Sequence, residues 1–184
     1  MHIKLEGSNT PDDAVIRSCI TLLLAGTCVA SCGGAAVRRD PATTAAIVER
    51  THCNGSAQDD PRIFTPDVAI GVAPVMKDQR LGKVDRQVLA GAELAIRAQP
   101  GLTSEWLDRS LICHQAHRVL GQVTAPEDDA YWLSGRWLDF AVRSRGDVFF
   151  VDIYAEDPEA ANAVLERARA FVAHRGAAAG QSSL

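Results

Sequence analysis

The stretch WLDFAVRSRGDVFFVDIYA, residues 137–155, decides the fold. Apolar and polar residues alternate in each half, and a period of two is typical of strands with one buried face. The halves flank Arg145-Gly146-Asp147, a short glycine-containing turn of the kind that joins antiparallel strands. The stretch therefore predicts a β-hairpin, whose core-facing side chains are Leu138, Phe140, Val142, Phe149, Val151 and Ile153.

The segments outside this hairpin supply the rest of a small domain. Residues 91–98, GAELAIRA, alternate in the same way and predict a third strand, and residues 68–75 form a weaker strand candidate. Residues 104–120 predict a helix. After the hairpin, Asp157-Pro158 combines a capping side chain with a first-turn proline and predicts a second helix that ends at Gly176.

The order strand, helix, strand, strand, helix predicts an α+β fold. Two helices on one face of a small antiparallel sheet form a two-layer sandwich, because each element then buries its apolar side. We expect this domain to span residues 67–175, with a loose tail over residues 176–184. Residues 32–66 are expected to be a tether with one short helix, which Asp40-Pro41 begins.

The amino-terminal residues carry a different kind of signal. Arg17 precedes an uncharged, mostly apolar run, residues 19–30, which is too short to span a bilayer because a helix needs about 20 residues to do so. A positive charge followed by a short apolar run is typical of a secretory signal peptide. The run leads into Val29-Ala30-Ser31-Cys32, which resembles the lipobox of bacterial lipoproteins.

The lipobox resemblance implies that residues 1–31 are removed and that Cys32 is acylated. The mature chain would then be held at a lipid bilayer, facing the periplasm or the cell surface. Because Gly33 follows Cys32, the same resemblance favours the outer membrane over the inner one. Residues 1–14 contain three acidic residues, which are unusual before such a signal, so we expect translation to start near Val15.

Composition narrows the functional classes. The net charge is −4 at pH 7, unlike the basic footprint of a nucleic-acid binder, so no nucleic-acid partner is expected. No motif in the chain indicates a particular reaction, and we assign no catalytic residue and no cofactor. The sequence predicts a membrane-anchored bacterial lipoprotein of the cell envelope with a non-enzymatic binding or structural role. An envelope protein is a further expected partner.

Two cysteines remain in the mature chain besides the lipidated one. They are Cys53 and Cys113, and an even number of cysteines in an oxidising compartment predicts a disulfide. Such a link closes a loop of 113 − 53 = 60 residues. In the chain-entropy account it stabilises the fold by about 4 kcal/mol.

Cys113 lies in the sequence LICHQAH, residues 111–117. On a helix that advances about 100° per residue, Cys113 shares a line with the bulky apolar Trp106 and Leu120. This pattern predicts that Cys113 lies in or near the core, with His117 at the flank and His114 partly exposed.

Two other hypotheses remain open for this segment. The i, i+4 spacing of Cys113 and His117 lets both side chains reach one metal ion. In this hypothesis the chain is a periplasmic lipoprotein that binds copper or zinc, with His114, His52 and Cys53 as further ligands. The third hypothesis is an enzyme with Cys113 as its nucleophile, which needs an exposed thiol and a positioned base.

A long acidic loop follows this helix. Its carboxylates Glu127, Asp128 and Asp129 are expected to be solvated, and we assign them no catalytic role. Tyr131 and Trp132 are expected to anchor the loop by packing.

Overall fold

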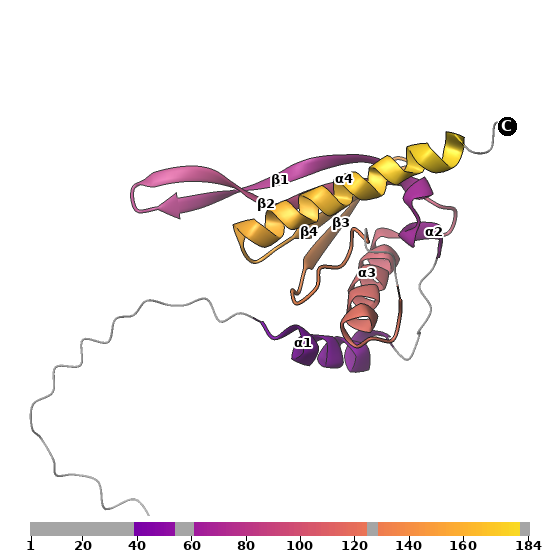
Figure 1. Cartoon of the computed structure of the whole chain (residues 1–184), viewed down its shortest axis with the longest axis horizontal. Coiled ribbons are helices and arrows are strands. Elements are labelled where there is room, and N and C mark those ends of the chain that lie inside the picture. Colours follow the sequence, from indigo (N-terminus) through magenta and orange to yellow (C-terminus); the bar gives the residue numbers. More distant parts are fainter. Residues whose placement is uncertain (1–38, 54–60, 125–128, 181–184) are drawn as a thin grey trace, which may run out of the picture. The chain divides into compact units, whose positions relative to one another are not determined.

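The computed structural model describes residues 39–53, 61–124 and 129–180, which belong to one compact unit of the chain. Four antiparallel strands form one sheet in the order β1-β2-β4-β3 (Figure 1). The strands are β1 (Ala69–Leu81), β2 (Val84–Arg97), β3 (Asp139–Arg145) and β4 (Val148–Tyr154). The hairpin predicted from residues 137–155 is therefore β3–β4, and its turn contains Gly146 with φ 62°.

Two long helices, α3 (Ser104–Val119) and α4 (Pro158–Gly180), cover one face of the sheet. Leu94 of β2 lies opposite Val151 of β4, and Val151 lies opposite Val142 of β3, so these side chains share that face. The predicted α+β fold, a two-layer sandwich with two helices on one face of an antiparallel sheet, is confirmed. The core between the layers receives Leu107 and Leu111 from α3, and Ala161, Val164, Leu165, Ala168 and Phe171 from α4.

Side-chain caps fix where both helices begin. Thr103 accepts a hydrogen bond from the Trp106 amide at the start of α3, and Asp157 accepts one from the Ala160 amide at the start of α4. The hydrogen bond from the Ala160 amide and the Arg136 guanidinium both lower the pKa of Asp157.

Helix α4 continues past Gly176, so the expected end there is wrong. The alanines that follow Gly176 are the strongest helix formers, which favours this continuation. None of the described helices combines the length and apolar character needed to cross a bilayer.

The segment before the sheet also packs on this body. Asp40 caps α1 (Pro41–Val48) as expected, accepting from the Thr43 amide at 2.9 Å, and the helix continues as a π-helical turn, η1 (Glu49–Cys53). Two short helices follow, α2 (Pro61–Phe64) and η2 (Pro66–Val68). Ile63 joins the main core, so part of the expected tether contributes to packing. The division of the chain into signal, tether, domain and tail remains a prediction.

The hairpin β1–β2 is much longer than the predicted strands 68–75 and 91–98. Its pairing continues from Met76–Leu89 to Leu81–Val84, whereas β4 pairs with β2 only from Gly91 onward. We call residues 76–89 the arm; it extends beyond the other strands as a two-stranded ribbon (Figure 1). Most arm side chains are exposed on both faces, so no alternation of apolar and polar residues marks these strands in the sequence.

Because the arm packs on so little, shortening it should scarcely change stability. We expect replacement of residues 77–88 by Asn-Gly, which forms a two-residue hairpin turn between Met76 and Leu89, to change the free energy of unfolding by less than about 1 kcal/mol. Urea unfolding followed by circular dichroism measures the change. A loss above about 2 kcal/mol would mean that the arm supports the core.

Candidate functional site

Helix α3 carries a row of buried polar side chains in its second half. They are Cys113, His114, Gln115 and His117. Gln115 both donates to and accepts from the Leu138 backbone, at 3.0 and 2.8 Å, which ties the helix to the start of β3. Buried polar groups are costly unless they are paired, so each member of this row needs a structural or functional reason.

Several expectations for α3 are wrong. The sequence places His114 partly exposed and His117 at a flank, but these residues are only 2% and 1% exposed. Trp106 and Leu120, placed on the core line with Cys113, are instead 38% and 37% exposed. The reason is that α3 packs against the sheet layer on one side and against α1 on another, so a helix with one buried face is the wrong description.

The predicted disulfide between Cys53 and Cys113 is confirmed. It joins the end of η1 to the middle of α3, with the two Cα atoms 5.5 Å apart. Beside it, the Arg109 guanidinium donates to the His52 carbonyl at 2.6 Å. The ring of His52 is exposed and contacts the Thr51 hydroxyl.

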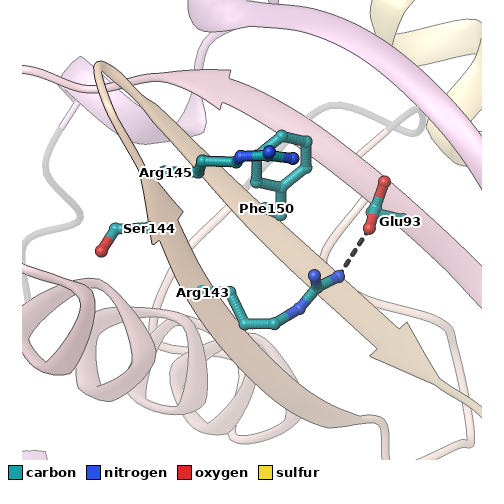
Figure 2. Close-up of a pocket in the computed structure, with 5 residues that line it drawn as sticks. All are labelled: Glu93, Arg143, Ser144, Arg145 and Phe150. Carbon is teal, nitrogen blue, oxygen red and sulfur yellow. Dashed lines mark hydrogen bonds and ion pairs between the residues drawn. The ribbon is translucent and has the colours of Figure 1, made fainter.

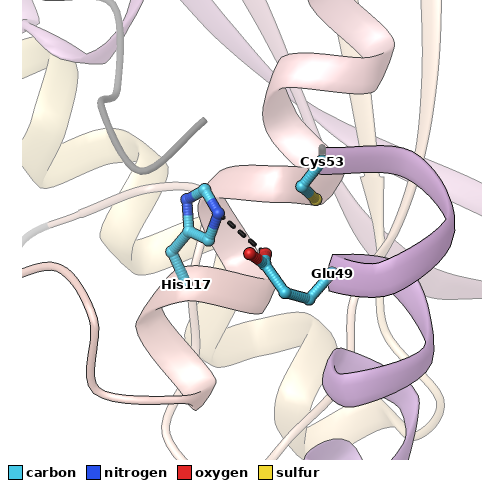
Figure 3. A group of neighbouring side chains, drawn as sticks. All are labelled: Glu49, Cys53 and His117. Carbon is cyan, nitrogen blue, oxygen red and sulfur yellow. Dashed lines mark ion pairs between the residues drawn. The ribbon is translucent and has the colours of Figure 1, made fainter. Parts of the chain in front are cut away.

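His117 lies next to this disulfide and faces Glu49 of η1 (Figure 3). The His117 Nε2 to Glu49 Oε2 distance is 2.9 Å, and neither ring nitrogen of His117 makes a hydrogen bond to a described residue. One ligand atom each of Glu49, Cys53 and His117 lies within 4.8 Å of the others. The structure thus brings together three residues of the metal hypothesis, Cys53, its disulfide partner Cys113, and His117, and it adds the carboxylate of Glu49.

Glu49 is the site residue that the sequence analysis missed. It is 68 residues from His117 in the sequence, and only the packing of α1 and η1 on α3 brings the two together. One signal was present: Glu49 precedes Cys53 by four positions, the same spacing as Cys113 and His117.

The disulfide limits the chemistry of this cluster. A cysteine sulfur binds a metal or acts as a nucleophile in its thiolate form, and neither sulfur is a thiolate while the Cys53–Cys113 bond is intact. The metal hypothesis and the Cys113 nucleophile hypothesis therefore both require a reduced form of the chain.

His114 belongs to a different buried pair. Its Nε2 lies 2.7 Å from Oδ2 of Asp129, and its ring stacks on Phe64 with the centroids 4.2 Å apart. The other oxygen of Asp129 accepts from the Tyr131 amide at 2.9 Å. Asp129 is buried, so its expected solvation is wrong, because it pairs with a histidine that is itself buried. Glu127 and Asp128 lie outside the described residues.

The aromatic residues after Asp129 anchor the loop. Tyr131 is fully buried, its hydroxyl donates to the Ile63 carbonyl, and burial and the nearby Asp129 raise its pKa. The guanidinium groups of Arg118 and Arg167 lie over the Trp132 ring, 4.3 and 5.8 Å from its centroid. These contacts agree with the predicted packing role.

A separate hollow lies at the β2, β4 and β3 strands (Figure 2). It has a volume of about 400 Å³ and is lined by Glu93, Arg143, Ser144, Arg145 and Phe150. Arg143 pairs with Glu93 at 2.6 Å and with Asp152 at 3.1 Å, and these bonds raise its pKa. Since two carboxylates already hold this cation, the hollow is mainly an ion-paired sheet surface.

Cys32, the predicted lipidation site, lies outside the described residues. No family model matches this chain, and no curated protein or solved structure is significantly similar to it.

Proposed function

We propose that this chain is an exported bacterial lipoprotein, acylated at Cys32, whose α+β body has a non-enzymatic binding or structural role in the cell envelope. The observation that carries the proposal is the Cys53–Cys113 disulfide. Disulfides persist in oxidising compartments and are rare in the cytosol, so the bond supports the export that the lipobox-like sequence predicts.

The buried side chains of α3 support a structural role for this helix. Cys113 joins it to η1, His114 joins it to the loop at Asp129, and Gln115 joins it to Leu138. Each polar group thus connects α3 to a different segment of the chain. Cross-links of this kind from Cys113, His114 and Gln115 favour one arrangement of the surrounding elements.

The arm supports a binding role, because it presents exposed strands outside the packed body. Its charged residues are four basic and two acidic, a net charge of 4 − 2 = +2, whereas the whole chain has a net charge of −4. This opposite sign favours an anionic partner surface in the envelope. The charged residues are Lys77, Asp78, Arg80, Lys83, Asp85 and Arg86.

An acylated Cys32 would keep the body close to the bilayer. Nine positions separate Cys32 from Pro41 at the start of α1. An extended chain spans at most about 3.6 Å per residue, so α1 would begin within about 32 Å of the acylated residue.

The test of this proposal is acylation at a single cysteine. The full-length chain is expressed in bacteria with an alkyne-tagged fatty acid, as wild type, Cys32→Ser and the matched control Cys28→Ser. We expect label and membrane association in the wild type and in the control, and loss of both in Cys32→Ser. Intact mass should place the amino terminus of the wild type at acylated Cys32. A full-length, unlabelled wild-type chain in the soluble fraction would contradict the proposal.

A further inference from the structure

We propose that reduction of the Cys53–Cys113 disulfide creates a zinc site whose four ligands are Cys53, Cys113, His117 and Glu49. The site goes beyond the proposed envelope role and does not depend on lipidation. The redox state of Cys53 and Cys113 would then decide whether the chain holds a disulfide or a zinc ion.

The positions of the ligand atoms fit a single ion. Atoms of Glu49, Cys53 and His117 already lie within 4.8 Å of one another, and Cys113 is bonded to Cys53 (Figure 3). Bonds of about 2.0 to 2.3 Å to zinc put tetrahedral ligand atoms roughly 3.3 to 3.8 Å apart. Cα atoms 5.5 Å apart let the two sulfurs reach that separation by side-chain rotation alone.

The backbone presents these ligands as two matched pairs. Glu49 and Cys53 are four positions apart on η1, and Cys113 and His117 are four positions apart on α3. Residues at this spacing on a helix lie on one side of it, so each segment can offer two ligands to one ion.

Contacts other than the disulfide hold the two segments together. Ala45 of α1 and Ala116 of α3 pack with Trp137 in a second apolar cluster, and the Arg109 guanidinium bonds to the His52 carbonyl. Reduction therefore frees the two sulfurs without removing the packing that positions them.

The surroundings of His117 suit a metal ligand. Its ring is buried, neither ring nitrogen makes a hydrogen bond to a described residue, and its one close polar contact is the carboxylate of Glu49. Buried polar atoms are rarely left without partners. A zinc ion would use the lone pair of Nε2 and would offset the negative charge of the buried carboxylate oxygen.

The donor set favours zinc over copper. Zinc accepts thiolate, imidazole and carboxylate ligands in one tetrahedral site, whereas Cu(I) prefers soft sulfur ligands. The Glu49 oxygen is therefore the feature that separates the two metals. His114 is paired with Asp129 and His52 is exposed beside Thr51, so neither belongs to this site.

The disulfide and zinc-bound forms interconvert by thiol–disulfide exchange. A dithiol reductant supplies two electrons and two protons, becomes a disulfide itself, and leaves thiols on Cys53 and Cys113. Zn²⁺ then bonds to both sulfurs as their two protons pass to water. Oxidation by a disulfide-class oxidant takes two electrons from the thiolates, restores the sulfur–sulfur bond and releases Zn²⁺. The oxidant takes up two protons as it becomes a dithiol.

Cobalt and zinc titration of the full chain tests the site. Cys19, Cys28 and Cys32 are changed to serine in every sample, so that Cys53 and Cys113 are the remaining thiols and the result is independent of acylation. After reduction by a phosphine and removal of the reductant without air, we expect one equivalent of Co²⁺ to give sulfur charge-transfer bands and tetrahedral visible bands. Zn²⁺ should abolish them, and the oxidised chain should show none.

Variants assign the remaining ligands. We expect Glu49→Gln and His117→Gln each to lower the zinc affinity of the reduced chain at least about 10-fold, and the matched control His52→Ala to leave it unchanged. Circular dichroism of the oxidised variants checks that each one folds. A reduced chain without cobalt bands would overturn the site, and so would unchanged zinc affinity in either Glu49→Gln or His117→Gln.

Discussion

Replacement of Gly91 by alanine is expected to lower the free energy of unfolding by at least about 3 kcal/mol. Gly91 lies in β2 where the arm leaves the sheet, opposite Val75 on one side and Tyr154 on the other, and its φ is 155°. A Cβ atom there would overlap the carbonyl oxygen of Ile153 and lie 2.9 Å from the carbonyl carbon. Both the backbone angle and the contact therefore oppose any side chain.

Gly71→Ala is the matched control for this substitution. Gly71 also lies in the β1–β2 hairpin, but the nearest atom to an added Cβ is that of Ala95 at 3.9 Å, an ordinary contact. We expect a change within about 1 kcal/mol for this variant. Urea unfolding of both variants measures the difference, and equal stabilities would contradict the close passage of β2 past Ile153.

Loss of the disulfide is expected to lower the free energy of unfolding by about 4 kcal/mol, because the bond closes a loop of 60 residues in the unfolded chain. The double variant Cys53→Ala, Cys113→Ala removes the bond in the serine background used for metal titration. Urea unfolding under oxidising conditions compares this variant with its parent. Identical unfolding midpoints would mean that the bond does not form in solution.

Reduction of the parent supplies the control. In the absence of metal, the reduced parent should unfold like the double variant, because both lack the covalent link. Zinc should then restore stability to the reduced parent alone, since only a chain with both thiols can bind it. An equal gain for the double variant would place the metal elsewhere.

The elements that bury one face could be predicted from the sequence. In β3 and β4 one side of each strand meets the helices, so alternation marks the hairpin of residues 139–154 clearly. The same alternation of apolar and polar residues predicted the part of β2 that covers residues 91–97. The arm escaped prediction because water surrounds both its faces, and the sequence then has no reason to alternate.

The candidate site was predictable only in part. The disulfide followed from counting cysteines, whereas the burial of His114 and His117 did not follow from helical spacing, because α3 is enclosed on two sides. Glu49 could be placed beside His117 only by knowing how η1 packs on α3. The sequence predicted a solvated Asp129 because an acidic loop does not indicate that a buried histidine, His114, lies beside it in the fold.

The two unpaired edges of the arm affect how copies of the chain associate in concentrated solution. No third described strand pairs with either edge of the arm, so main-chain N–H and C=O groups remain unpaired by strands there. A neighbouring molecule could add a strand at these edges. Lysine and arginine side chains along the ribbon act as gatekeepers, because like charges repel when two copies align. Ionic strength weakens that repulsion, so the colloidal stability of the protein should fall as salt rises.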